Sequence, residues 1–98
     1  MLGDRVTAQQ ACAWGMIHEV VPDAAMADVA RGLAERLAVM PTAALGAMKR
    51  LLDASHHNDL DAQLDLEEEL QRQAGRSRDY VEGVRAFQEK RAPNFEGR

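Results

Sequence analysis

The stretch PTAALGAMKRLLDASHHNDLDAQLDLEEELQRQAG, residues 41–75, predicts two helices joined by a short turn. Apolar residues recur at three- and four-residue steps on both sides of the HHND group at 56–59, which has the composition of a turn. One helix is therefore expected over residues 42–55 and the other from residue 59 to about residue 73. Gly75 is well placed to end the second helix.

Three more helices are expected around this pair, over residues 7–14, 23–40 and 77–92. Each begins at a side chain that can accept a hydrogen bond from a free backbone N–H, as residue 59 also can. The capping side chains are Thr7, which has capping-box spacing to Gln10, then Asp23, Asp59 and Ser77. The sequence thus predicts a mostly helical chain of about five helices.

One short segment, MIHEVVP at residues 16–22, is expected to be extended. Its β-branched residues suit a strand, and Pro22 ends it. No second convincing strand exists with which it could pair, and an unpaired strand is not stable by itself. The prediction is therefore one short strand whose partner lies outside this chain.

Composition limits the classes of protein that this chain can be. Its 98 residues suit one domain, and 12 basic against 16 acidic side chains give a net charge of −4, which argues against a protein that mainly grips nucleic acid. The single cysteine, Cys12, excludes an intramolecular disulfide. With no long apolar run and no secretion signal, a cytoplasmic chain is expected, without a membrane partner.

Several groups of polar side chains could carry chemistry, but each has a plainer interpretation. His56, His57, Asp59 and Asp61 are the densest set of possible metal ligands, yet a solvated turn explains them better, and no metal is expected. The acids at 67–69 could supply a general acid or base only if one were buried, and consecutive helical residues face different sides. No common catalytic motif is present, so no catalytic residue is assigned.

The last helix offers a stronger candidate in VRAFQEKRAPNF, residues 84–95. Phe87 lies three residues before Lys90 and four before Arg91, so an aromatic ring and two cations share one side of the helix. A ring can stack on a purine while a neighbouring cation binds a phosphate. The structural alternative is that Phe87 anchors a core and the cations complement the helix dipole.

Three segments resemble the carboxyl-terminal third of the crotonase superfamily, the enoyl-CoA hydratases and isomerases. They are LGDRVTAQQACAWGMIHEVVPD, LAVMPTAALGAMKRLLDAS and SRDYVEGVRAFQEKRAPNFEGR. The resemblance extends from Leu2 to Arg98. It implies that residues 1–22 end the crotonase core and that residues 23–98 form the helical oligomerisation domain, known as the trimerisation domain. The catalytic ββα core, with its oxyanion hole and its proton-transferring carboxylate, is then absent from this chain.

The resemblance also implies a substrate and partners. The PTAAL and DLEEELQRQAGRSRDYVEGV segments are most similar to the isomerases of bacterial phenylacetate breakdown, which act on the ring epoxide of phenylacetyl-CoA. The parent enzyme would stabilise a thioester enolate, use acyl-CoA as a substrate without a further cofactor, and assemble as a homo-oligomer, a trimer or hexamer. The chain alone is expected to be inactive and to associate with itself.

In that family the last helix contributes to the coenzyme A site. Phe87 is accordingly expected near the adenine end, Lys90 near a phosphate, and Arg91 as a second cation. A rival interpretation is a free-standing helical interaction module without an enzymatic parent, which explains the apolar stripes equally well but not the isolated strand.

Overall fold

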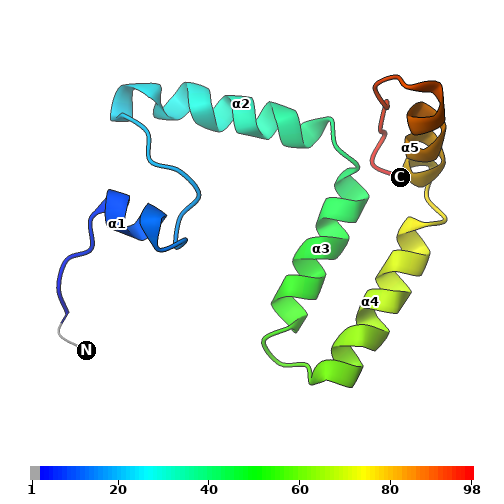
Figure 1. The fold of residues 1–98 in the computed structure, drawn as a ribbon, viewed down its shortest axis with the longest axis horizontal. Coiled ribbons are helices and arrows are strands. Elements are labelled where there is room, and N and C mark those ends of the chain that lie inside the picture. Colours follow the sequence, from blue (N-terminus) through cyan, green and yellow to red (C-terminus); the bar gives the residue numbers. More distant parts are fainter. Residues whose placement is uncertain (1–2) are drawn as a thin grey trace. The chain divides into compact units, whose positions relative to one another are not determined.

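The computed structural model describes residues 3–98, and these residues form five α-helices, α1 to α5, and one short 3-10 helix (Figure 1). They fall into two compact units, Met1–Leu33 and Ala34–Arg98. The predicted mostly helical class is confirmed. Within residues 3–98 no helix is long and apolar enough to cross a membrane.

The first unit begins with α1, Ala8–Ala13, which confirms the predicted capping box. The backbone N–H of Gln10 donates to Thr7 Oγ1 at 3.2 Å, and the N–H of Thr7 donates to Gln10 Oε1 at 3.0 Å. These two bonds satisfy donors that a helix start otherwise leaves free. Gly15 follows the helix with φ of +74°, a conformation that glycine adopts without strain.

The predicted strand at residues 16–22 is wrong for this chain. Residues 16–18 form a bend and residues 19–22 have no regular secondary structure, so there is no strand ladder. The N–H of Met16 donates back to the carbonyl of Ala11 at 2.8 Å. Because a strand is defined by hydrogen bonds to a neighbouring strand, extended propensity alone could not produce one where residues 3–98 supply no partner.

The next helix differs from its prediction at both ends. A 3-10 turn, Asp23–Ala25, precedes α2, Met26–Ala38. Asp23 was predicted to be the cap, but Pro22 occupies that position and no side chain caps the turn. The helix stops at Ala38 instead of Met40, because a residue before proline is disfavoured in helical conformation and Pro41 follows.

In the second unit, α3 (Thr42–Ala54) and α4 (Leu60–Ala74) lie side by side and run in opposite directions (Figure 1). The turn at 55–59 joins them, and Asp59 accepts a bond from the N–H of Ala62 at 2.9 Å, as predicted. Gln63 reaches across the pair to the carbonyl of Leu51 at 3.3 Å. Leu70 is 4% exposed and is the most deeply buried large side chain described.

The last helix, α5 (Arg78–Glu89), begins at Ser77, whose hydroxyl accepts from the N–H of Tyr80 at 3.0 Å and confirms the predicted cap. After α5 the chain turns back along the helix, and residues 91–98 are called the tail below (Figure 1). A Cβ added to Gly83 would lie 3.6 Å from the ring of Phe95, an ordinary contact distance, so this ring of the tail lies against α5. Ala86, on α5, is only 1% exposed.

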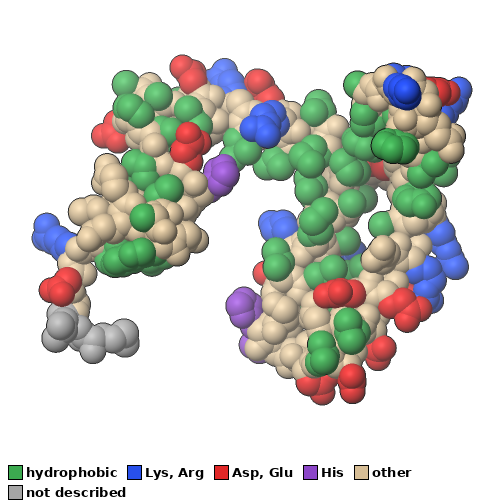
Figure 2. Space-filling view, viewed as in Figure 1, with side chains coloured by type: hydrophobic (Ala, Val, Ile, Leu, Met, Phe, Trp, Pro, Cys, Tyr) green, Lys and Arg blue, Asp and Glu red, His purple; other side chains and the backbone are tan. Residues whose placement is uncertain are grey.

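Many large apolar side chains remain exposed in the second unit, and Figure 2 shows hydrophobic side chains on the surface of α3 and α4. On these two helices they are Met48, Leu52, Leu60 and Leu64. This helix pair therefore leaves large apolar side chains exposed. Exposed apolar surface on this scale is typical of interaction surfaces.

Candidate functional site

The end of α5 has an unusual backbone. Lys90 caps the helix in left-handed conformation, with φ of 54° and ψ of 39°, and is the one residue other than glycine with positive φ in residues 3–98. Its N–H bonds to the carbonyls of Ala86 and Phe87, and the N–H of Arg91 donates to Ala86 at 3.0 Å. Glycine is the usual residue at this position. A lysine here therefore carries a conformational cost.

Phe87 and Lys90 are both available to a ligand. Phe87 is 85% exposed, so the alternative that it anchors a core within this chain is wrong. Lys90 is exposed, and its ammonium makes no ion pair or hydrogen bond with another side chain in the described part of the chain. The two lie about one turn apart. An exposed aromatic ring and an exposed cation without a side-chain partner therefore both occur at the end of α5.

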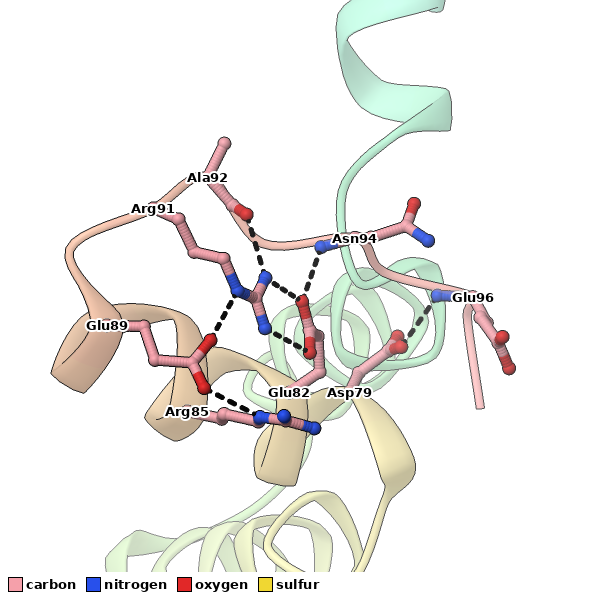
Figure 3. A network of polar contacts seen from close by, with 8 residues as sticks. All are labelled: Asp79, Glu82, Arg85, Glu89, Arg91, Ala92, Asn94 and Glu96. Carbon is pink, nitrogen blue, oxygen red and sulfur yellow. Dashed lines mark hydrogen bonds and ion pairs between the residues drawn. The ribbon is translucent and has the colours of Figure 1, made fainter.

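Arg91 is placed differently from Lys90. Its guanidinium donates to Glu82 through both terminal nitrogens, at 2.6 and 3.0 Å, and Nε donates to Glu89 at 2.6 Å (Figure 3). Another N–H donates to the carbonyl of Ala92 at 3.0 Å. Four of its five N–H groups are therefore engaged within the chain. The role of Arg91 as a second ligand cation stays a prediction.

Two carboxylates of α5 bind backbone N–H groups of the tail. Glu82 accepts from Asn94 at 2.8 Å in addition to Arg91. Asp79, only 5% exposed, accepts from Glu96 at 2.7 Å and from Gly97 at 2.9 Å, and its own N–H donates to the carbonyl of Arg98 at 3.0 Å. The tail is thus fastened to α5 along its length.

Sequence reasoning missed Asp79 and Glu82. Both are acids in the first two turns of a predicted helix, which usually means a solvated face that complements the helix dipole. Their partners are backbone groups and an arginine nine residues beyond Glu82, and helix periodicity relates none of these to them. No local signal in the sequence could have identified them.

The ion pairs change the acid–base properties of this end of the chain. The guanidinium of Arg91, with the N–H of Asn94, lowers the pKa of Glu82 from its ordinary value of 4.5 to about 2. Hydrogen bonds from Arg85 and then Arg91 lower the pKa of Glu89. Glu82, followed by Glu89, raises the pKa of Arg91. The network is therefore fully ionised at neutral pH.

A pH titration of the chain should reveal this network. A carboxylate whose pKa is lowered by folding stabilises the folded form above its unfolded pKa, near 4.5, and this contribution disappears as the pH falls through about 2. We expect the NMR shift of the Asn94 amide proton, which bonds to Glu82, to titrate with a midpoint near 2. The Glu82→Gln variant is the control and should lack this transition. A midpoint near 4.5 would show that the pair does not form.

The other polar groups considered above do not come together. His56 and His57 are exposed in the turn between α3 and α4, and within residues 3–98 no three His, Cys, Asp or Glu side chains are placed to hold a metal ion. Glu68 and Glu69 pair with Arg72 on the surface of α4, at 3.1 and 3.2 Å. These acids are solvated helix residues.

Comparisons with known proteins agree on one family. The family model described as enoyl-CoA hydratase/isomerase matches residues 1–98. The chain is 51% identical over 98 residues to the 1,2-epoxyphenylacetyl-CoA isomerase of Escherichia coli K12, covering 100% of this chain and 37% of that protein. It is 36% identical over 96 residues to the 2,3-dehydroadipyl-CoA hydratase of the same strain, covering 98% of this chain and 38% of that one.

Solved structures give the same result. A crystal structure of enoyl-CoA hydratase from Bacillus anthracis superposes with a TM-score of 0.85 at 30% identity, covering 98% of this chain and 37% of that chain. The chain therefore spans somewhat more than a third of the length of the relatives it matches.

Proposed function

Because this chain belongs to the enoyl-CoA hydratase/isomerase family, we propose that it is the carboxyl-terminal segment of a longer acyl-CoA isomerase or hydratase. The isomerase is favoured, with the 1,2-epoxide of phenylacetyl-CoA as substrate. The identity of 51% to an isomerase of that substrate, over the whole chain, is the observation that carries this choice. The reaction would be supported by residues outside this chain, which hold the thioester oxygen as enolate charge develops.

Two tasks are proposed for the chain itself. Its exposed apolar helix faces would be covered by the rest of the enzyme and by other subunits, with residues 1–22 continuing the core and residues 23–98 forming the oligomerisation domain. The end of α5 would bind the nucleotide end of coenzyme A. Exposed Phe87 would stack against the adenine, and Lys90 would pair with a phosphate.

Turnover by the full-length enzyme tests the proposed reaction. We expect the purified enzyme to convert 1,2-epoxyphenylacetyl-CoA with a kcat/KM at least tenfold above that for simple enoyl-CoA thioesters, a difference of about 1.4 kcal/mol in transition-state binding. Equal or greater efficiency in hydrating an enoyl-CoA would favour a hydratase. Inactivity toward both classes of thioester would overturn the proposal.

The Lys90→Ala variant tests the coenzyme A contact. A hydrogen bond to a charged group contributes roughly 1.5 to 3 kcal/mol, so we expect KM for the CoA thioester to rise at least tenfold at low salt, with kcat nearly unchanged. Added salt should shrink the difference, because it screens exposed charges. Lys49→Ala, which removes an exposed lysine of α3, is the matched control. Equal KM values for the two variants would show that Lys90 does not bind coenzyme A.

A further inference from the structure

Lys90 has a left-handed backbone at the end of α5. For an L-residue other than glycine this conformation costs roughly 1 kcal/mol or more, and glycine would avoid the cost at a helix end. Such a residue persists where its surroundings hold it, and these residues gather at ligand sites.

The residue after Lys90 is the most firmly held in the network. Arg91 bonds through separate nitrogens to Glu82 and Glu89, both on α5, and to the carbonyl of Ala92 (Figure 3). Glu82 also accepts the N–H of Asn94, so one carboxylate binds two residues of the tail, Arg91 and Asn94. The segment that follows Lys90 is therefore bonded to α5, the helix that ends just before Lys90.

We infer that Glu82, acting through Arg91, is a positioning residue that holds the backbone of Lys90 in place for the nucleotide end of coenzyme A. This inference rests on the coenzyme A role proposed above. A lysine that binds a ligand from a mobile loop loses both backbone and side-chain conformational freedom, and a backbone that is already fixed leaves only the side-chain part to be lost on binding. Arg91 is then a support for the ligand cation instead of a ligand cation itself.

Two variants of the full-length enzyme test the inference. Glu82→Gln removes the charge that holds the guanidinium, and Arg91→Lys keeps a cation but lacks the planar fork that bonds to Glu82, Glu89 and Ala92 at once. We expect each to raise KM for the acyl-CoA thioester about fivefold, which corresponds to about 1 kcal/mol, with kcat unchanged. The matching acyl-pantetheine thioester lacks the nucleotide, and its kcat/KM should not change.

The readouts separate positioning from general stability. Glu68→Gln is the matched control, since it removes an exposed α4 carboxylate that pairs with an arginine outside the network, and it should behave as the parent enzyme. In a Lys90→Ala background, Glu82→Gln should raise KM no further, because residues that act through one group are not additive. Full additivity would contradict the inference.

The outcomes also distinguish this inference from the proposed function. If Lys90→Ala raises KM while Glu82→Gln and Arg91→Lys do not, the coenzyme A contact stands and the positioning role is wrong. If Lys90→Ala has no effect, the contact itself is absent and the inference falls with it. If both network variants lose activity toward the pantetheine thioester as well, the network serves folding alone, which overturns the inference.

Discussion

Replacing Asp79 by alanine is expected to lower the free energy of unfolding of the second unit by about 3 kcal/mol. This carboxylate is 5% exposed and accepts the N–H groups of Glu96 and Gly97. Removing it leaves two donors without their partner, each at a cost of roughly 1 to 3 kcal/mol unless water reaches them. Urea unfolding followed by circular dichroism measures the loss, and NMR should show the Glu96 and Gly97 amides unprotected from exchange.

The chain contains a closely matched control for Asp79. Asp61 is the second residue of α4, as Asp79 is the second residue of α5, but Asp61 is exposed and bonds to no tail. Asp61→Ala removes only the favourable interaction with the helix dipole, worth roughly 0.3 to 1 kcal/mol. Equal losses for the two variants would mean that the bonds from Asp79 to the tail add nothing to stability.

Truncation of Leu70 is expected to have an effect of similar size through a different mechanism. Leu70 is 4% exposed, and Leu→Ala changes at buried sites cost roughly 2 to 5 kcal/mol, because they lose apolar contact and leave a cavity. We expect Leu70→Ala to unfold the α3–α4 pair at a distinctly lower urea concentration. Since few side chains of this unit are fully buried, the variant should approach complete unfolding at 37 °C.

Leu60→Ala provides the comparison for Leu70, because it makes the same chemical change in the same helix at a residue that is 72% exposed. Its effect on the free energy of unfolding should stay within about 0.5 kcal/mol, as for most surface substitutions. A loss at Leu60 as large as that at Leu70 would show that another copy of the chain covers Leu60 in solution. Light scattering at several concentrations would then detect the association.

Most of the helical architecture could be predicted from the sequence, because helix starts are local. Thr7, Asp59 and Ser77 each cap a helix by accepting a bond from the N–H three residues ahead. Both partners are close in the sequence, so the sequence alone predicts the contact. Asp23 is an aspartate like Asp59, but its side chain caps no helix. Pro22 before it takes the capping position, and the chain enters α2 through a 3-10 turn.

The candidate site could be predicted only in part. The spacing predicted Phe87, Lys90 and Arg91 on one side of a helix, but α5 ends at Glu89, so only Phe87 lies on it. Lys90 is the cap that follows the helix, and Arg91 already belongs to the tail. The spacing did not distinguish the two cations, one of which is exposed while the other is bound by carboxylates. It also left open whether Phe87 is buried, because an aromatic residue on an apolar stripe fits a core and a ligand face equally well.

The sequence by itself determined the helices, their caps and the resemblance to a family of acyl-CoA enzymes, since these depend on residues close together in the chain. The tertiary structure decided three features: the absence of a strand at residues 16–22, the exposure of Phe87, and the fastening of the tail by Asp79 and Glu82. Each of these depends on which groups, distant in sequence or absent from the chain, come within hydrogen-bonding or packing distance. A strand needs a neighbouring strand, burial needs a covering surface, and a carboxylate releases its water only when other donors replace it.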